Sequence, residues 1–420
     1  MTNHKPVATE LGGTYAGGDA AIAASSARPA ARTREAFLLL LVTHFTVDCY
    51  SSTLPTIQPL LASRFGLTLA HAGLLGAFWM FASSVMQLPF GLLSDRLHSR
   101  MFTIIGPVAA AGFLTATSLA TGFAGLVVFL LLGGMGVAAF HPHSTSQAGH
   151  LGGQRRGLAT AIFITAGTAG LGVGPLYLAE VIDRYGYENL WVAAIPAVAI
   201  SPLLVWRVPQ PTVDPQVKRR GVDWAVLRQQ RRPLLAHYAL VVLRSIVQVG
   251  MAQYLALYMV QVRGTDFKAA SVALAVFFAS TSAGSFVGGS LADRLGGRRV
   301  IVVSCLASGP LLACFLALDG WLSLLALFVG GTVLLSTIPV NIVMARELVP
   351  SQAGTAAALM MGFGWGLAGI AFVPFAGLLA DLVGLDLVLW GFTALPILGI
   401  PITLLLPSSG QPEPGANRNG

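Results

Sequence analysis

The chain has 420 residues, of which 55% are hydrophobic and only 10% are charged, whereas a soluble domain carries about 25% charged residues. This balance excludes an ordinary soluble protein and predicts membrane-spanning helices, because about 20 apolar residues cross a hydrocarbon core of about 30 Å. The net charge of +8 would suggest nucleic acid in a soluble protein, but here the basic residues follow membrane topology, and we expect no nucleic-acid partner.

The two ends of the chain and its cysteines limit what else it contains. Residues 1–35 are rich in Ala, Gly and Ser and lack the apolar core of a signal peptide. This segment and residues 408–420 bury too little surface to fold alone, so we expect two disordered tails. Cys49, Cys305 and Cys314 all lie in apolar runs, which argues against a disulfide framework and a zinc site.

Twelve apolar segments follow one another between the tails. They are residues 36–61, 69–93, 101–121, 123–144, 156–180, 188–206, 234–262, 268–291, 299–318, 321–345, 353–379 and 384–406. The polar stretch 207–232 separates the sixth segment from the seventh. The sequence therefore predicts an all-α integral membrane protein with twelve transmembrane helices. They form two pseudo-symmetric six-helix halves, residues 36–206 and 233–407, joined by a cytoplasmic linker.

The basic residues predict the orientation of these helices. If the N-terminus is inside, the tails and the even-to-odd loops carry all but five of the 25 Lys and Arg residues. Arg64, Arg184, Arg263 and Lys268 lie on the opposite side, and Arg244 lies within a span. Because basic residues favour the cytoplasmic side, we expect both termini inside, with the chain in the cytoplasmic (inner) membrane.

A loop motif occurs twice, between the second and third spans of each half. Asp95 in the first copy and Asp293 in the second are 198 residues apart, nearly half the chain. An internal repeat of this kind divides the chain into two similar units. The motif residues are Gly91, Asp95, Arg96 and Arg100 in the first copy and Gly289, Asp293, Arg294, Arg298 and Arg299 in the second.

This motif resembles the loop signature of the major facilitator superfamily. The second copy is close to the full pattern, and the first departs from it at His98, where a glycine is expected. The resemblance implies two six-helix halves with a substrate site near the membrane midplane between them. It also implies that the two loops control the conformational cycle, holding the cytoplasmic side closed, and do not contact substrate.

Two charged residues lie deep in the predicted spans. His44 and Asp48 are four residues apart in the first span, so they share a helix face, and Asp48 lies roughly 18 Å into that span. Arg244 has nearly the same depth in the equivalent helix of the second half. A charge at the bilayer centre costs at least about 2.5–3.5 kcal/mol, so each must face protein or water.

Two interpretations of these charges remain open. In the first, Asp48 and Arg244 form a static ion pair that neutralises both side chains. In the second, which we favour, Asp48 carries protons while Arg244, with Gln248 nearby, contacts substrate or acts as a charge partner. His44 either donates a hydrogen bond to Asp48 or helps to carry protons, since the ordinary pKa of imidazole is about 6.5.

The segment Phe140-His-Pro-His-Ser144 lies at the cytoplasmic end of the fourth span. Its proline removes a backbone hydrogen bond and predicts an irregular helix end. A metal site is conceivable, but His141 and His143 do not face each other on a helix and no third ligand is evident, so we expect none. We predict a cytoplasmic gate of His141, Pro142 and His143, with Asn341 at the equivalent place of the second half.

The fifth span contains Gly170-x-x-x-Gly174-Pro175. This pattern is similar to the antiporter signature of drug-exporting relatives, although Leu178 and Ala179 stand where a glycine pair is expected. It favours export, while a proline-kinked, closely packed helix is the structural alternative.

Several of these motifs together resemble the fosmidomycin-resistance group of bacterial major facilitator transporters. The matching stretches are His44-x-x-x-Asp48, Phe140-His-Pro-His-Ser144, Arg156-Gly-Leu-Ala159 and Leu243-Arg-Ser245. In that group the fourth-span motif usually reads Phe-His-Pro-Glu, and here His143 replaces the acid. The resemblance implies proton-coupled efflux of a small drug-like or anionic compound by a monomeric carrier without a cofactor.

Two other functions remain open on the sequence. One is a proton-coupled uptake symporter of a small organic anion held by Arg244. The other is a non-transporting membrane sensor or scaffold, although the linker 207–232 is too short for a soluble output domain. We expect no enzyme, because the sequence shows no nucleophile–base pair, phosphate loop or metal set. Fold alone fixes neither substrate nor direction.

The orientation is testable with single cysteines in a background without the native cysteines. Cysteine at Ala30 or Ser409 is expected to be shielded from an impermeant thiol reagent in intact cells, because both tails are predicted to be cytoplasmic. Labelling of either position from outside would overturn the orientation.

Overall fold

In this computed structural model the backbone is described for residues 16–97, 99–210, 223–352, 356, 360 and 364–406, and the side chains from residue 32 onward except those of Asp95 and Arg96. The predicted tail 408–420 and the linker residues 211–222 lie outside the described residues. Every regular element in the described part is a helix.

Twelve helical segments in the described part are long and apolar enough to cross a membrane, which confirms the predicted number. The first half contains α1 (Ala16–Ser51), α2 (Thr53–Phe65), α3 (Leu69–Met80), α4 (Gln87–Leu97), α5 (Met101–Thr115), α6 (Phe123–Leu151), α7 (Arg156–Tyr185) and α8 (Ile195–Arg207). The second half contains α9 (Trp224–Gln229), α10 (Arg231–Gln261), α11 (Phe267–Leu295), α12 (Gly297–Ala317), α13 (Gly320–Leu335), α14 (Thr337–Leu348), α16 (Gly364–Leu367), α17 (Val373–Val383), α18 (Leu385–Ala394) and α19 (Gly399–Thr403). Some spans consist of two helices in line, such as α1 with α2.

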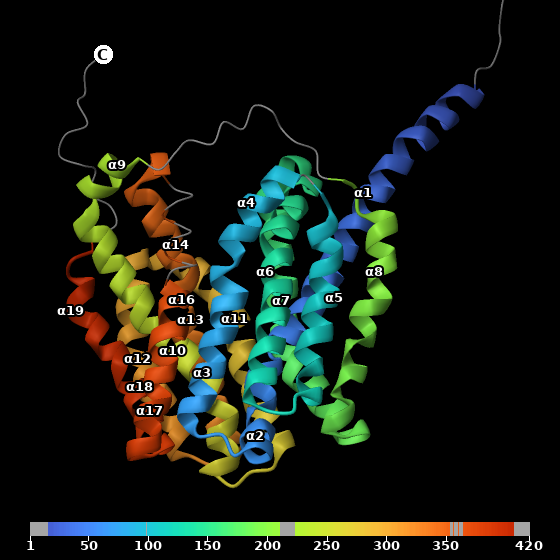
Figure 1. Cartoon of the computed structure of the whole chain (residues 1–420). Coiled ribbons are helices and arrows are strands. Elements are labelled where there is room, and N and C mark those ends of the chain that lie inside the picture. The colour runs from blue at the N-terminus through green and yellow to red at the C-terminus, as the bar shows by residue number, and fades with distance from the viewer. Residues whose placement is uncertain are drawn as a thin grey trace, which may run out of the picture.

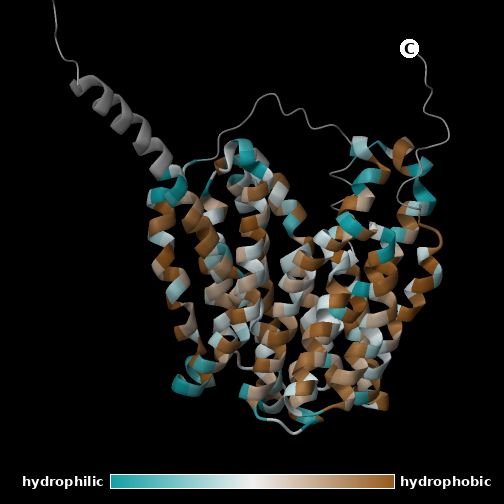
Figure 2. Ribbon diagram, turned by 180° about the vertical axis from the view of Figure 1, so that it is seen from behind, coloured by the Kyte–Doolittle hydropathy of each residue, from teal (hydrophilic) through white to brown (hydrophobic). Residues whose placement is uncertain are grey.

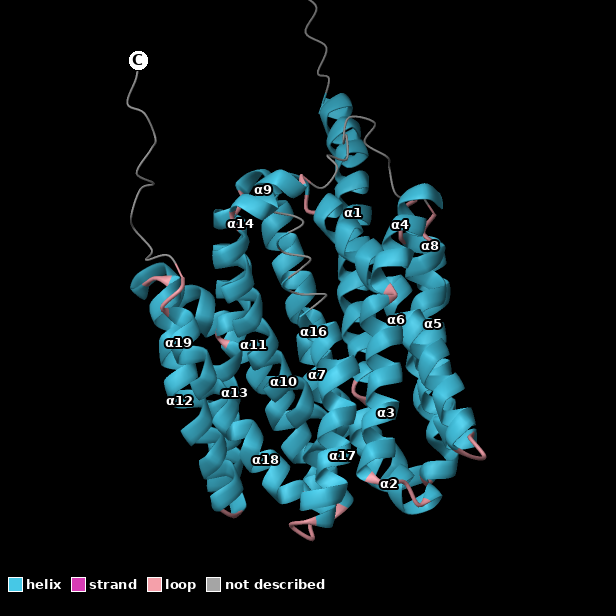
Figure 3. Ribbon diagram, turned by 60° about the vertical axis from the view of Figure 1, so that its left-hand side comes forward, coloured by secondary structure: helices cyan, strands magenta, loops and turns pink. Residues whose placement is uncertain are grey.

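The helices form two bundles that stand side by side. In Figure 1 the blue-to-green helices α1–α8 make one bundle and the yellow-to-red helices from α10 onward make the other. Figure 3 shows that short loops join successive helices. Helix α1 begins and α9 lies at the upper end of Figure 1, whereas α2 and α17 end at the lower end. This arrangement is the predicted fold class of two six-helix halves.

Helices also occupy parts of the segments expected to be irregular. The backbone is helical from Ala16, and this stretch of the predicted tail is rich in alanine, which has the highest helix propensity. Within the predicted linker, Asp223 caps α9 by accepting hydrogen bonds from the backbone N–H groups of Ala225 and Val226. The boundaries between tail, halves and linker therefore stay a prediction.

Each half has its own apolar core, and the outer surface is apolar as well. Tyr50, Phe140 and Phe163 are fully buried in the first half, as are Tyr254 and Phe277 in the second. Hydrophobic residues also line the outer faces of the helices, whereas hydrophilic residues gather toward the helix ends (Figure 2). An apolar exterior on a packed helical bundle fits a lipid environment.

The first and fifth spans approach each other closely because glycines line their contact. A Cβ atom at Gly170 would lie 2.0 Å from the carbonyl oxygen of Phe45, and one at Gly174 would lie 2.4 Å from that of Cys49. Small residues allow such close approach of membrane helices. Helix α7 continues through Pro175, and Gly170 and Gly174 allow its close packing on α1. The link of this pattern to export stays a prediction.

The close contact predicts a selective loss of stability. Gly170→Ala should lower the thermal unfolding temperature in detergent, because overpacking costs about 1–3 kcal/mol. The matched control is Gly157→Ala on the same helix, where a Cβ atom meets nothing within 4 Å. This control should be neutral or stabilising, since alanine has the higher helix propensity. Equal effects of the two substitutions would contradict the close approach of α1 and α7.

Candidate functional site

Three titratable side chains meet inside the first half. His44 and Asp48 come from α1, and His141 comes from α6. The Nε2 atom of His44 lies 3.5 Å from Oδ2 of Asp48, and the Nε2 atom of His141 lies 3.2 Å from Oδ1. The two Nε2 atoms are 3.3 Å apart. We call these three residues the His–Asp cluster.

The backbone fixes which ring nitrogens carry hydrogen. Nδ1 of His44 lies 2.7 Å from the carbonyl oxygen of Phe163, and Nδ1 of His141 lies 2.9 Å from that of Val137. A carbonyl oxygen only accepts hydrogen bonds, so each Nδ1 must be the donor. In each neutral ring the Nε2 atom therefore bears a lone pair that points toward the other ring and toward Asp48.

This arrangement has places for protons at its centre. Without a shared proton, two nitrogen lone pairs and a carboxylate face one another, which is electrostatically unfavourable. A proton on one Nε2 atom converts that ring into a cation that donates to the carboxylate of Asp48, so the cluster becomes neutral. A second proton on the other ring would make it positive. The chemistry that the geometry favours is reversible proton binding.

The surroundings keep this cluster largely away from water. The ring of Phe163 stacks on that of His44 with centroids 4.1 Å apart. A Cβ atom at Gly167 would lie 2.4 Å from Nε2 of His44, so only glycine leaves room here. His44 is buried, whereas the side chains of Asp48 and His141 are 15% and 22% exposed. Access to the cluster is therefore on the side of Asp48 and His141.

The structure divides the fourth-span motif between two places. His141 belongs to the His–Asp cluster, whereas Nδ1 of His143 lies 2.6 Å from the hydroxyl oxygen of Ser94 on α4. Pro142 packs against Gly91 of the first loop motif. Helix α6 continues to Leu151, so the expected irregular helix end at Pro142 was wrong. A helix tolerates proline in a bundle when neighbouring groups replace the lost contact.

A metal ion is the other ligand that the His–Asp cluster could hold. One ligand atom from each residue lies within 4.8 Å of the others. Imidazole and carboxylate suit several divalent transition metals. We expected no metal because His141 and His143 do not face each other and no third ligand was evident. The group of His44, Asp48 and His141 joins two helices, and spacing along one helix cannot show such a group.

Arg244 is buried in the second half and bonded to neighbours on its own helix. Its Nη1 donates to Oε1 of Gln248 over 2.6 Å, and its Nη2 donates to the hydroxyl of Ser245 over 3.1 Å. Its Nε atom is buried and has no hydrogen-bond partner. Among the described residues, no carboxylate forms an ion pair with it. A buried cation of this kind is costly until an anion approaches.

The expected pair of Asp48 with Arg244 is thus not formed in this structure. Asp48 is paired with the two histidines of its own half, and Arg244 is bonded to neighbours on its own helix. Position along a helix, from which the pair was predicted, does not determine which way a side chain points.

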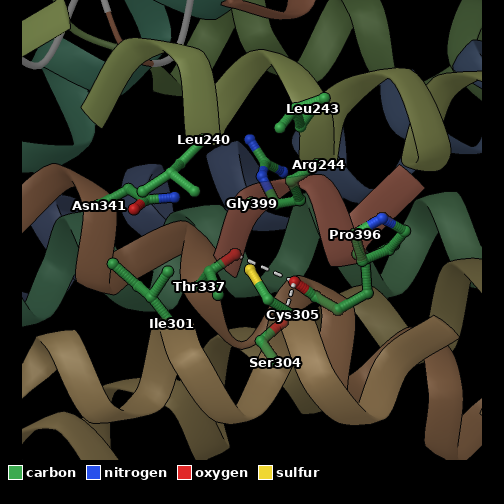
Figure 4. A pocket seen from close by; sticks show the side chains of 11 residues that line it. Leu240, Leu243, Arg244, Ile301, Ser304, Cys305, Thr337, Asn341, Pro396 and Gly399 are labelled. Carbon is green, nitrogen blue, oxygen red and sulfur yellow. Dashed lines mark hydrogen bonds between the residues drawn. The ribbon is translucent and has the colours of Figure 1, made fainter. Parts of the chain in front are cut away.

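A small cavity lies beside Arg244 (Figure 4). It measures about 20 Å³, and Thr337 and Asn341 on α14 line it together with Leu240 on α10. That volume holds about one water molecule. The Oδ1 atom of Asn341 is buried without a hydrogen-bond partner. Asn341, which we predicted at a cytoplasmic gate, therefore lines the cavity beside Arg244.

Arg100 of the first loop motif forms hydrogen bonds within its own half. Nη1 of Arg100 donates to the carbonyl oxygen of Val208 over 2.7 Å, and its backbone N–H donates to Oε1 of Gln210 over 3.2 Å. These bonds join the loop to the end of α8. The side chains of Asp95 and Arg96 lie outside the described residues.

The second loop motif lies largely at the surface. Asp293, Arg294 and Arg299 are exposed and Arg298 is half-buried, while a Cβ atom at Gly289 would meet nothing within 4 Å. The control of the conformational cycle by both motifs stays a prediction.

Comparisons with known proteins point to one family. The family model described as Major Facilitator Superfamily matches residues 37–276 and 264–420. The chain is 28% identical over 397 residues to the fosmidomycin resistance protein of Escherichia coli strain K12, which covers 92% of this chain and 97% of that protein. It is also 28% identical over 299 residues to the membrane sensor protein UhpC of Salmonella typhimurium strain LT2, covering 64% of this chain and 66% of that protein.

The fold has solved counterparts as well. The chain resembles a bacterial homologue of the human lysosomal transporter Spinster, solved in an inward-facing and occupied conformation, with a TM-score of 0.74. The two chains are 15% identical, and the match covers 88% of this chain and 95% of that one. At this identity the likeness shows the fold alone. The family that these comparisons indicate is one of transporters and not of enzymes.

The isolated charge of Arg244 predicts an unusual response to mutation. Arg244→Met combined with Gln248→Leu removes the buried donor and its acceptor together, and it should raise the thermal unfolding temperature in detergent. Replacing buried charged groups by apolar ones of similar size is often stabilising by about 1–4 kcal/mol. Arg184→Met, at an exposed arginine, should have little effect. A marked loss of stability in the double variant would show that Arg244 has an opposite charge in the folded protein.

Proposed function

This chain belongs to the major facilitator superfamily, and we propose that it is a secondary active transporter that exports a small drug-like or anionic compound in exchange for protons. The observation that carries the proposal is the His–Asp cluster, whose geometry favours reversible proton binding inside a membrane-spanning half. The similarity of this chain to the fosmidomycin resistance protein, over most of both chains, supports export as the direction of transport.

Asp48 and His141 are the proposed proton carriers. The proton lies between Nε2 of His141 and Oδ1 of Asp48, which are 3.2 Å apart, and His44 supports the carboxylate from the other side. All three residues belong to one half, so the cluster moves as a unit when the halves rock against each other. A proton can then be taken up from one side of the membrane and released to the other.

Arg244 is the proposed site for the anionic part of the substrate. Its guanidinium is buried, bonded to Gln248 and Ser245, and lacks a counter-charge among the described residues. A carboxylate or another oxyanion would supply that charge and form strong charge-assisted hydrogen bonds. Because Asp48 is bonded within the other half, we expect substrate and proton to be linked through the movement of the halves and not by direct competition for Arg244.

An uptake symporter is the second candidate. An anion site at Arg244 suits uptake as well as export, and the direction rests on the name of a relative.

A sensor role is supported by the relative named membrane sensor protein UhpC. Because both sites lie within a single chain, we propose that the protein functions as a monomer in the cytoplasmic membrane, with both termini inside.

Substrate flux in proteoliposomes distinguishes these functions. An antiporter accumulates substrate on the side from which protons leave, a symporter accumulates it on the side to which protons move, and a sensor gives no flux with a gradient of either sign. Each run is repeated with the chelator EDTA. Unchanged flux supports proton binding by the His–Asp cluster, whereas loss of flux would indicate a metal ion there.

Single substitutions test the coupling residues. Asp48→Asn and His141→Gln should abolish gradient-driven accumulation while leaving exchange of substrate across the membrane, because a proton can no longer be shared between them. His44→Gln should change the pH profile with a smaller loss of rate. His150→Gln, on the same helix as His141 but exposed, is the matched control and should transport normally. Full gradient-driven accumulation by Asp48→Asn would rule out its coupling role.

A further inference from the structure

The two halves are joined at the end of the molecule where α3 begins. This end lies opposite the one where α1 begins (Figure 1), and α17 from the second half lies beside α3 there (Figure 3). The carboxylate of Asp381 on α17 accepts two backbone hydrogen bonds from α3. Its Oδ1 lies 2.8 Å from the nitrogen of Leu69, and its Oδ2 lies 2.9 Å from that of Ala70.

These bonds complete the N-terminal cap of α3. The first backbone N–H groups of a helix have no partner within the helix. The hydroxyl of Thr68, the capping residue, accepts a hydrogen bond from the N–H of His71 over 3.3 Å. Asp381 serves the two preceding N–H groups, so one helix cap is built from both halves of the chain.

The contact suits an interaction that must form and break. A carboxylate is favourable at the positive end of a helix dipole, and its hydrogen bonds to N–H groups are charge-assisted. Asp381 is exposed, Leu69 and Ala70 are half-buried, and the two hydrogen bonds between them lie at an exposed position. When the halves separate, water can therefore bind both the carboxylate and the two N–H groups. The charge of Asp381 is then not left unsolvated in an apolar interior.

Close backbone packing lies next to this cap. A Cβ atom at Gly377 would lie 2.3 Å from the carbonyl oxygen of Leu69, and one at Gly73 would lie 2.8 Å from Cα of Pro374. The side-chain amide of Gln253 donates to the carbonyl oxygen of Ala72 over 2.8 Å. The halves are thus in direct backbone contact beside the cap.

We propose that Asp381 is the positioning residue that holds this end of the transporter closed. The far-side gate consists of Leu69, Ala70, Ala72, Gln253 and Asp381, and with the predicted topology it faces the outside of the cell. When the halves rock to open this end, Asp381 leaves the N-terminus of α3. This inference rests on the alternating movement in the proposed function, but it concerns a residue that touches neither the His–Asp cluster nor Arg244.

The test measures the distance between the halves with spin labels at Ser63 on α2 and Gln261 on α10. Both positions are exposed, and the two helices pack against each other. Asp381→Asn and Asp381→Ala should raise the ratio of separated to closed molecules at least about fivefold, the effect of losing roughly one hydrogen bond of ordinary net strength. Asp381→Glu keeps the charge and should recover much of the closed population.

Two controls make the result decisive. Asp386→Asn removes a neighbouring exposed aspartate in the first turn of α18 and should leave the ratio unchanged. Labels at Ser63 and Tyr185, both in the first half, should keep one distance in every variant, which shows that the half stays folded. The proposal would be overturned if Asp381→Asn had the same ratio of separated to closed molecules as the parent protein. It would also be overturned if Asp386→Asn raised that ratio as much as Asp381→Asn does. The measurement needs neither substrate nor a proton gradient, so its outcome is independent of whether transport is proton-coupled.

Discussion

The cost of burying charge in a membrane protein organises the interior of this molecule. Asp48 is surrounded by two imidazole rings whose Nδ1 atoms are held by backbone carbonyl oxygens. The rings are kept in place by α6 and by α7, which approaches α1 closely because Gly167 and Gly170 lack side chains. A larger residue at either position would displace the groups that make Asp48 tolerable in an apolar half. Helix packing and the geometry of the His–Asp cluster therefore depend on the same glycines.

Burying the charge of Arg244 has the same free-energy cost, but here no opposite charge among the described residues offsets it. Two polar side chains of its own helix hold the guanidinium, yet its Nε atom remains without a partner. A protein can bear such a charge when binding of an anion offsets the penalty in part of its working cycle. The two buried charges lie in different halves, and each finds its described hydrogen-bond partners within its own half. Movement of the halves therefore need not break the contacts of either charge.

The sequence predicted the parts of this structure that depend on position along one helix. Hydropathy gave twelve spans, the repeated loop motif gave the two halves, and a spacing of four residues placed His44 beside Asp48. It did not predict that His141 joins them or that Arg244 stays apart, because contacts between helices depend on how each helix is rotated about its axis. Asp381 gave no signal either, since an aspartate near a helix end is ordinary until its partner helix is known.

A carrier needs contacts that are strong enough to close one side and weak enough to release it, and the far-side gate has this character. Its carboxylate is exposed and its partners are backbone N–H groups, so opening replaces protein hydrogen bonds by water at a modest cost. The His–Asp cluster, in contrast, is largely shielded and lies wholly within one half, so the proton that we propose it carries can stay bound through such a movement. In the proposed function, reversible contacts between the halves and a proton site inside one half keep conformational change apart from proton transfer. The two processes are then linked only through the position of one half against the other.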